Sequence, residues 1–174
     1  MNTCDHTIPP SDWVKRFVPM IPMQGKVLDL ACGTGRHVRL LTDMGAEVVV
    51  VDRDISLLGD LARLTAVEAI QADLEIGKWP LPDRLFAGIV VTNYLHRPLF
   101  PLLLSSLISG GVLIYETFSQ GNEKFGKPSN PDFLLHPGEL LKIVERQARV
   151  LAYEDLVVNE PKPAAVQRIC VVRS

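Results

Sequence analysis

The sequence predicts an α/β fold: a three-layer α-β-α sandwich around a doubly wound, mostly parallel sheet of seven strands that ends in a C-terminal antiparallel hairpin. Three observations predict it. Short apolar runs alternate with helical stretches along most of the chain, as in βαβ units. A glycine turn at 33–35 directly follows the first of these runs. The last two runs, 150–157 and 165–172, are joined by too few residues for a helical crossover, so they should pair as a hairpin.

The individual elements follow in order along the chain. A short helix over 11–18 is closed by Pro19 and Pro22, which do not continue a helix. Gly45 is expected to stop the second helix, and the unbroken valines of 47–52 are typical of a strand buried on both faces. The first five strands are expected at 26–31, 47–52, 66–72, 85–92 and 112–116. The helices linking and following them are expected at 36–44, from 54 or 56 to 64, 98–106 and 137–146.

Length and composition indicate one domain of ordinary globular type. The chain of 174 residues is 47% hydrophobic, so we expect a single domain over 1–174, with an N-terminal helix and linker over 1–22. The loop over 118–135 is long and rich in turn-forming residues, which makes it a candidate active-site lid. No apolar run reaches the roughly 20 residues needed to cross a bilayer, and the N-terminus has no secretory pattern. We therefore expect a cytoplasmic protein without a membrane partner.

Cysteine and charge exclude further classes. Cys4, Cys32 and Cys170 are scattered and odd in number, so they predict neither a disulfide framework nor a metal site. The net charge of −2 gives no basic field that would recruit nucleic acid. No oligomeric state is predicted.

The densest chemical signal is the loop that joins the first strand to the next helix, Asp29-Leu30-Ala31-Cys32-Gly33-Thr34-Gly35. Gly33 and Gly35 permit positive φ angles and close approach of a ligand to the backbone. The dinucleotide fingerprint GxGxxG is not completed, because Val38 occupies its third small position. A glycine corner also occurs where the chain only needs to turn. The class of ligand is therefore inferred from the acidic residues near the loop.

Three aspartates lie along the first three strands. Asp29 precedes the loop, where a carboxylate repels a pyrophosphate and attracts a cationic amine. Asp52 ends the second strand about 20 residues after the turn, the spacing of a ribose-binding acid. Asp73 ends the third strand, where it can accept a hydrogen bond from an exocyclic amine such as that of adenine, or cap the following turn. Together they describe a ligand with an amine, a ribose and an adenine but no phosphate.

With this motif and these acids, the sequence resembles the class I S-adenosylmethionine-dependent methyltransferases, from about residue 26 to residue 173. Ala31 stands where many members carry another glycine. The resemblance implies the Rossmann-like methyltransferase fold, S-adenosyl-L-methionine as cofactor, and transfer of its methyl group to an acceptor. A closer likeness is to the small tellurite-resistance-type methyltransferases, through the runs 93–97, 115–118 and 133–141. It does not imply a tellurite substrate.

The resemblance also implies which residues hold the cofactor. Asp29 and the loop 31–35 should hold the methionine part, and Asp52 should hold the ribose. The side chain of Arg53 should lie beside the adenine. Asp73 and the backbone amide of Leu74, at the end of the third strand, should bind the edge of the adenine. Together the expected cofactor-binding residues are Asp29, Ala31, Cys32, Gly33, Gly35, Asp52, Arg53, Asp73, Leu74 and Asn93. Of these, Cys32 is expected to be a small loop filler rather than a nucleophile.

The acceptor side should be formed after the fourth and fifth strands. Thr92 and Asn93 should lie under the sulfonium, and Tyr94 and His96 are the candidate catalytic residues. A histidine side chain can act as a base, so His96 is either a general base or a residue that packs structurally. Arg97 can pair with an anionic acceptor or lie solvated at the surface. Methyl transfer depends chiefly on orientation, so the reaction does not require a catalytic triad. Two further acceptor-side candidates are Tyr115 and Glu116.

Two other functions remain open. An NAD(P)-dependent oxidoreductase would share the fold type and the ribose acid. A catalytically silent S-adenosylmethionine-binding partner subunit would retain the same cofactor residues. As acceptor we expect a small molecule, because the run 92–95 lacks the prolines typical of enzymes that methylate the exocyclic amines of nucleic acid bases.

Overall fold

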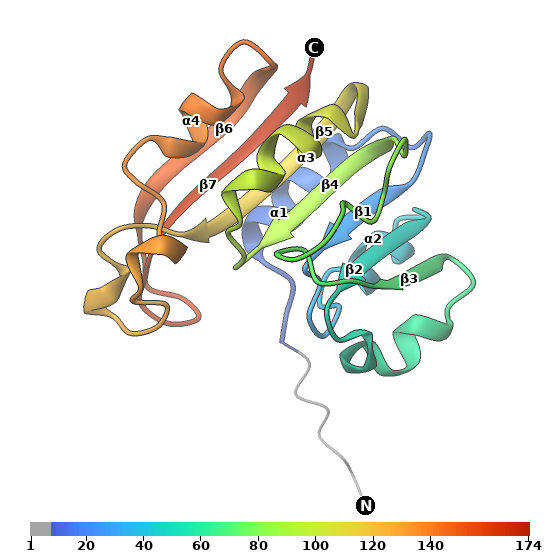
Figure 1. Cartoon of the computed structure of the whole chain (residues 1–174), viewed down its shortest axis with the longest axis horizontal. Helices are drawn as coiled ribbons and strands as arrows, with labels where there is room; N and C mark the ends of the chain where they lie inside the picture. Colours follow the sequence, from blue (N-terminus) through green and yellow to red (C-terminus); the bar gives the residue numbers. More distant parts are fainter. Residues whose placement is uncertain (1–7) are drawn as a thin grey trace, which may run out of the picture.

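The structure is a computed structural model that describes residues 8–174, and it contains one seven-stranded sheet between two layers of helices (Figure 1). Cys4 and the first seven residues of the predicted segment 1–22 lie outside the described residues. The strand order is β3-β2-β1-β4-β5-β7-β6; β7 runs antiparallel to both of its neighbours and the other pairs are parallel. The predicted fold class is thereby confirmed. The strands are β1 Val27–Leu30, β2 Val48–Asp52, β3 Val67–Gln71, β4 Phe86–Thr92, β5 Leu107–Phe118, β6 Ala148–Val158 and β7 Ala164–Arg173.

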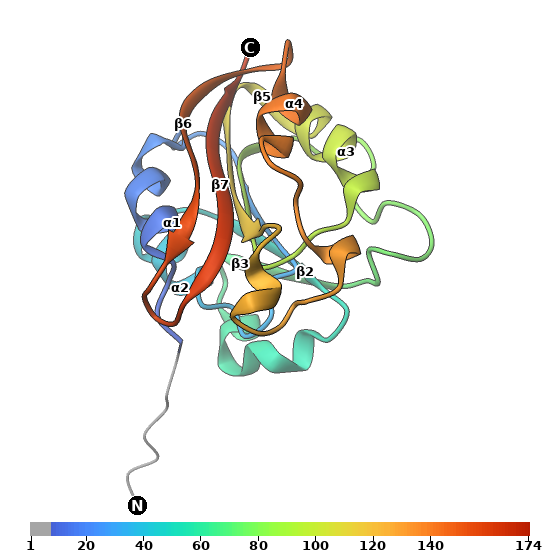
Figure 2. The same ribbon diagram turned by 90° about the vertical axis from the view of Figure 1, so that its left-hand side faces the viewer.

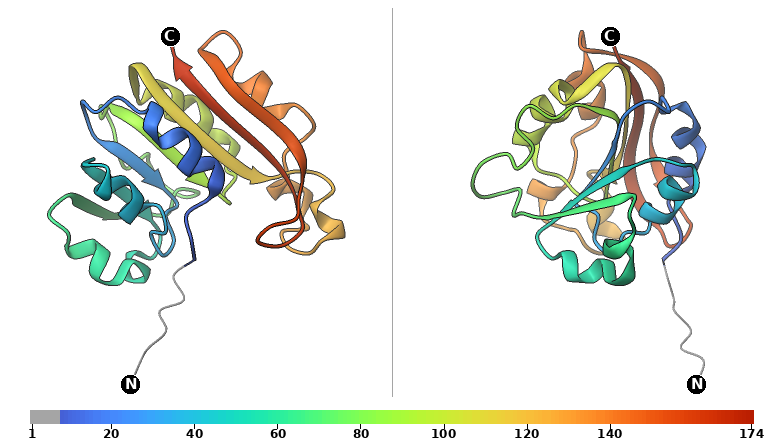
Figure 3. Two further views of the ribbon diagram at one scale, coloured as in Figure 1. Left: turned by 180° about the vertical axis from the view of Figure 1, so that it is seen from behind. Right: turned by 90° about the vertical axis from the view of Figure 1, so that its right-hand side faces the viewer.

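Helices cover both faces of the sheet, and each face has its own apolar core. Figure 2 shows α1 and α2 on one side of the sheet and α3 and α4 on the other, and Figure 3 shows the first pair from behind. Trp13 and Leu41 pack in the core under the first pair, whereas Leu103 and Leu140 pack under the second. The α-helices are α1 Asp12–Phe17, α2 Val38–Asp43, α3 Phe100–Ser105 and α4 Glu139–Val144. The 3₁₀ helices are η1 Val18–Met20, η2 Ile55–Arg63, η3 Arg97–Leu99, η4 Asn122–Lys124 and η5 Pro131–Phe133.

The apolar pattern of the inner strands matches their burial. The four valines 48–51 of β2 are all at most 1% exposed, as their unbroken run predicts. The C-terminal hairpin also follows the prediction, with β6 and β7 in antiparallel register from Ala148 opposite Arg173 to Val158 opposite Ala164. Among residues 8–174, every helix is too short or too polar to cross a lipid bilayer.

Two elements differ from the prediction, and one link has no helix. The described chain runs from Gln71 to Phe86 without a helix, and no helix range was predicted between the strands at 66–72 and 85–92. Pro80 and Pro82 lie in this link and remove backbone donors that a helix would need. The helix after Asp54 is the 3₁₀ helix η2, interrupted at Gly59, where φ is +54°. The fifth strand is much longer than 112–116, because the glycine pair before it lies inside β5 at a register shift against β4.

Candidate functional site

The strand order reverses between β1 and β4, which are neighbours in the sheet. The carboxyl ends of the parallel strands therefore face a common space at this point. In doubly wound sheets, ligands bind beyond these ends. A cavity of about 360 Å³ lies there, which we call the acidic cavity. Most of the residues predicted from sequence to hold a cofactor meet in its wall. The acidic cavity is lined by Ala31, Asp52, Arg53, Ala72, Asp73, Leu74, Glu75, Asn93 and Tyr94.

The loop that ends β1 is shaped by left-handed backbone conformations. The φ angles of Ala31, Gly33 and Gly35 are +53°, +54° and +74°. At Gly35 a Cβ atom would also lie 2.8 Å from a methyl group of Leu58 and 3.0 Å from one of Leu61, so a side chain has no room. At Gly33 no atom lies within 4 Å of such a Cβ, so the φ angle alone favours glycine there.

Asp52 is held in place from two sides at the end of β2. Its Oδ2 accepts a hydrogen bond from the backbone N–H of Gly33 at 2.8 Å, and its Oδ1 accepts one from Asp54 at 3.0 Å. Each carboxylate oxygen has a second lone pair, so both oxygens can still accept from a ligand. The glycine loop and the ribose-type acid are thus fixed to each other directly.

Asp29 lies behind the loop on β1. It is 2% exposed, and its Oδ2 is buried without a hydrogen-bond partner. Burial raises the pKa of this carboxyl to about 7; the nearby cation of Arg36 opposes the shift and the charge of Asp52 adds to it. A buried acceptor without a donor is uncommon in native proteins and calls for an explanation.

Several of the predicted residues of the loop support the cavity without forming its wall. Asp29, Gly33 and Gly35 are not among the residues that line the cavity, and Cys32 packs in the core under α1 and α2. Burial raises the pKa of the Cys32 thiol strongly, so it stays protonated. The small-filler interpretation of Cys32 fits this position.

At the end of β3, Asp73 caps the next turn by accepting a hydrogen bond from the Glu75 N–H at 2.9 Å. Its second oxygen remains free of protein hydrogen bonds in the described chain, and Leu74 lies beside it in the wall. The carboxylate of Glu75 also lines the cavity, which the sequence analysis did not foresee. Its only signal is its position two residues after Asp73.

The two candidate catalytic residues occupy different surroundings. Tyr94 lines the acidic cavity, and its buried hydroxyl has no hydrogen-bond partner. Burial, and then the charges of Glu75 and Asp73, raise the pKa of Tyr94 to about 12, so its phenol is neutral at physiological pH. His96 lines none of the cavities found beside the carboxyl ends of the strands in the described structure.

A second cavity, of about 620 Å³, lies between the N-terminal segment 8–12, β5 and the β6–β7 turn. We call it the N-terminal cavity. Asn93, whose φ is +55°, is the one residue that lines both cavities. Arg36 also lines the N-terminal cavity and donates a hydrogen bond to Thr92 Oγ1 at 3.2 Å. Glu116, predicted on the acceptor side, lies in this wall as well.

Arg97 is hydrogen-bonded within the protein. Its guanidinium donates to Glu139 at 2.7 and 3.0 Å, and to the carbonyl oxygens of Asp132 and Leu134 at 2.8 and 2.9 Å. Neither sequence interpretation, a partner for an anionic acceptor or a solvated surface arginine, included these contacts within the protein, which leave the side chain 36% exposed. Arg97 instead ties the chain after β4 to the end of the loop 118–135. Tyr115 is likewise structural, since its hydroxyl donates to the Tyr94 carbonyl at 2.6 Å.

Comparison with known proteins agrees with this arrangement. Residues 27–107 match the model of a protein family described as a methyltransferase domain. No curated protein sequence matches the chain. Solved structures show the same fold: TehB from Haemophilus influenzae has a TM-score of 0.74 and 17% identity, over 94% of this chain. The present chain spans only 62% of the length of that protein.

Two further structures cover nearly the whole of both chains. A structure titled as an S-adenosylmethionine-dependent methyltransferase from Mesorhizobium loti has a TM-score of 0.71 and 17% identity, over 91% of this chain and 96% of its own. The glycopeptide N-methyltransferase MtfA, in complex with S-adenosyl-L-homocysteine, has a TM-score of 0.67 and 17% identity, over 100% of this chain and 94% of its own.

Proposed function

We propose that this chain is a class I S-adenosylmethionine-dependent methyltransferase that methylates a small molecule. The fold and the match of residues 27–107 to a methyltransferase domain support the proposal. One observation carries the proposal. Three acidic residues, Asp52, Asp73 and Glu75, line the acidic cavity, and Arg53 is the one cationic residue among its described lining residues. Such a wall repels a pyrophosphate and suits a cationic nucleoside such as S-adenosylmethionine.

The residues present fit this cofactor. S-adenosylmethionine supplies a methyl group on a positive sulfur: the acceptor's lone pair forms the new bond to carbon as the carbon–sulfur bond breaks, and the electron pair leaves with the neutral thioether. The unpartnered Oδ2 of Asp29 provides an acceptor on the amine side of the loop. We assign the ribose hydroxyls to the remaining lone pairs of Asp52. The adenine edge is assigned to the free oxygen of Asp73 and the N–H of Leu74, with Arg53 beside the ring.

The acceptor is assigned to the N-terminal cavity, because Asn93 joins it to the acidic cavity. Tyr94 is proposed to orient the reactants rather than to remove a proton, since its raised pKa keeps the phenol neutral. His96 lines neither cavity, so we expect orientation, not general base catalysis, to supply most of the rate. Replacing His96 by Ala should then lower turnover by less than about tenfold, against roughly 10²–10⁴-fold for loss of a general base.

Neither alternative function gains support from the structure. A dinucleotide would bring its pyrophosphate against the acidic wall, and Val38 is fully buried where the third small residue of a dinucleotide loop would stand. A silent cofactor-binding subunit would differ only in turnover. Production of S-adenosylhomocysteine with a broad panel of small-molecule acceptors separates it from an enzyme.

Cofactor choice is tested by calorimetry and thermal unfolding with S-adenosylhomocysteine and with NAD. At one hundred times its dissociation constant, S-adenosylhomocysteine should stabilise the fold by about 2.7 kcal/mol, or roughly 5–10 °C. The variant Asp52→Asn should bind at least about tenfold more weakly, because it loses charge-assisted hydrogen bonds. The exposed Asp43→Asn is the matched control and should bind normally. Tight binding of NAD with no heat from S-adenosylhomocysteine would overturn the proposal.

The loop 118–135 remains a candidate lid. Phe118 is its one residue in the wall of the N-terminal cavity. The buried Asn122 anchors the loop, because its Oδ1 accepts from Ala165 N–H at 3.2 Å and its Nδ2 donates to Pro128. Deletion of residues 121–131 tests the lid role: unchanged turnover with intact cofactor binding would contradict it.

A further inference from the structure

The N-terminal segment is built into the wall of the N-terminal cavity. Ile8, Pro9 and Pro10 line the cavity directly, and Ser11 and Asp12 continue the wall into α1. Apart from Lys15 on α1, the other residues of the wall are distant in sequence from this segment, and specific contacts join it to them.

Ser11 makes those contacts with two different elements. Its backbone N–H donates to Nε2 of His37 at 3.1 Å, and its hydroxyl donates to Oε1 of Glu116 at 2.7 Å. The hydroxyl oxygen also accepts from the N–H groups of Trp13 and Val14, which caps α1. One residue therefore joins the start of α1 to two walls of the site.

His37 connects this contact to the cofactor loop. It follows Arg36 directly and is 1% exposed. Its Nε2 accepts a hydrogen bond and therefore carries no proton. Burial, and then the charge of Arg36, lower the pKa of the imidazole to about 3, which agrees with a neutral ring. A buried imidazole is unfavourable unless it is hydrogen-bonded, and the Ser11 N–H supplies the bond.

Glu116 connects the same contact to the corner between the two cavities. Its carbonyl oxygen accepts from the N–H of Asn93 at 2.9 Å, and its Oε2 accepts from Arg168 at 3.2 Å. Its side chain is only 12% exposed. Ser11 thus reaches the cofactor loop through His37 and the shared residue Asn93 through Glu116.

We propose that Ser11, His37 and Glu116 are positioning residues that couple the cofactor loop to the wall of the N-terminal cavity. The inference rests on the proposed function in taking this cavity as the acceptor site. Occupation of the acidic cavity should then tighten the contacts that hold the segment 8–12, so that cofactor binding stabilises the wall of the acceptor site. The contact acts in both directions, because coupling between two sites is reciprocal.

Amide hydrogen exchange, read by mass spectrometry with and without S-adenosylhomocysteine, tests the coupling. In the wild type, the ligand should slow exchange in residues 8–17. His37→Phe, which removes the acceptor at similar size, should abolish this slowing and raise exchange there by roughly tenfold, as expected for a lost hydrogen bond. His37→Gln retains an acceptor and should restore the coupling. Wild-type slowing in His37→Phe would overturn the proposal.

A second variant guards against misfolding and against failure of the proposed function. Ser11→Ala removes the bond to Glu116 and should raise exchange in residues 33–38 even without ligand, whereas Ser105→Ala, an exposed serine on α3, should not. If S-adenosylhomocysteine gives no heat with the wild type, the proposed function fails. The coupling is then decided by this ligand-free exchange, and unchanged rates in both Ser11→Ala and His37→Phe would refute it.

Discussion

The burial of the Asp29 carboxyl group is electrostatically unfavourable. It is buried, one of its oxygens has no partner, and its pKa is raised to about 7. The unfolded chain releases this proton near pH 3.8, whereas the folded protein holds it until about pH 7. Between these values the unfolded state binds fewer protons, so the contribution of Asp29 to stability falls as the pH rises and is level above about pH 7. The site therefore gives up stability to keep a carboxylate ready for a cationic amine.

We therefore predict that Asp29→Asn stabilises the ligand-free protein in a pH-dependent way. Relative to the wild type, the variant should gain several degrees of melting temperature at pH 8 and much less at pH 4.5, since only the higher pH ionises the buried acid. At the same time it should lose S-adenosylhomocysteine binding. Thermal unfolding at the two pH values checks this, and an equal difference at both would contradict it.

Substitutions at Gly33 and Gly35 distinguish the cost of backbone strain from the cost of steric clash within one loop. Gly33→Ala meets only the positive φ and should cost about 1–2 kcal/mol. Gly35→Ala also forces its Cβ against Leu58 and Leu61, and should cost roughly 2–4 kcal/mol. Urea unfolding of both variants measures the difference. Equal destabilisation would mean that Leu58 and Leu61 of η2 move away from the added Cβ without a loss of stability.

At the scale of elements, the chain after β4 and the chain before α4 are joined by a single side chain. Arg97 donates to Glu139 and to two backbone carbonyl groups. Although burial raises the pKa of Glu139, its bonds with Arg97 and the His136 N–H lower it overall, so the pair remains ionised. The corner that carries Asn93 and Tyr94 is thus fixed from the side opposite to Ser11.

Replacing Arg97 by Gln should destabilise the fold by roughly 2–3 kcal/mol, because the half-buried carboxylate and two carbonyl groups lose their donor. The matched control is Arg84→Gln, which breaks the more exposed pair with Glu68 and should cost less than about 1 kcal/mol. Urea unfolding compares the two variants, and limited proteolysis should cleave the loop 118–135 faster in Arg97→Gln alone. Equal stability losses would argue against the anchoring role.

Local sequence predicted most elements but not the contacts between them. Burial on both faces and turn length each leave a pattern within a few residues of the sequence. This is why the valines of β2, the aspartate that ends it and the hairpin link could be predicted. The bonds from Ser11 to His37 and from Arg97 to the residues before α4 depend on chain segments far apart in sequence. Nothing near Arg97 distinguishes it from a solvated arginine, so its anchoring role became visible only in the folded chain.

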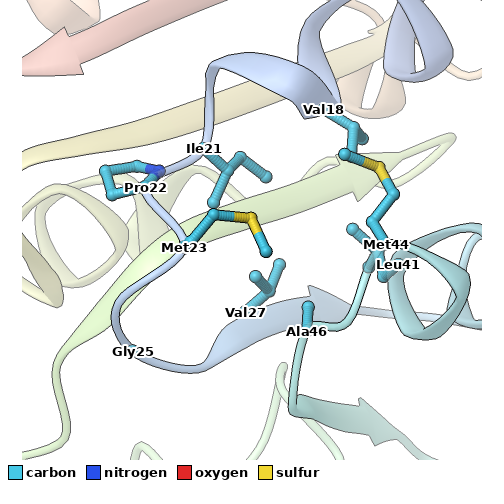
Figure 4. A pocket seen from close by; sticks show the side chains of 9 residues that line it. All are labelled: Val18, Ile21, Pro22, Met23, Gly25, Val27, Leu41, Met44 and Ala46. Atoms are coloured by element: carbon cyan, nitrogen blue, oxygen red, sulfur yellow. The ribbon is translucent and has the colours of Figure 1, made fainter.

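At the scale of the whole molecule, the two ends of the sheet differ in character. The acidic cavity and the N-terminal cavity both lie at the carboxyl ends of the parallel strands. At the opposite end, before β1 and β2, there is a small apolar hollow, where Met23, Met44 and Ile21 gather (Figure 4). Its side chains carry no groups that bind or react with a polar substrate, so we assign the chemistry to one end and packing to the other.

Substitutions at this apolar end should affect stability alone. Met23 is 71% exposed, and Met23→Gln should change the free energy of unfolding by less than about 0.5 kcal/mol. Ile21 fills the space above Gly88, and Ile21→Ala should cost about 2–4 kcal/mol. Calorimetry should give unchanged S-adenosylhomocysteine affinity for both folded variants. Weakened affinity in Met23→Gln would show that the two ends communicate.

The sharing of a single residue, Asn93, by two otherwise separate cavities has a kinetic consequence. A spent nucleoside can depart and a fresh one can enter without crossing the compartment that holds the acceptor. We expect this layout to allow successive rounds of alkylation on one captured molecule, with the final degree of substitution set by how long that molecule stays.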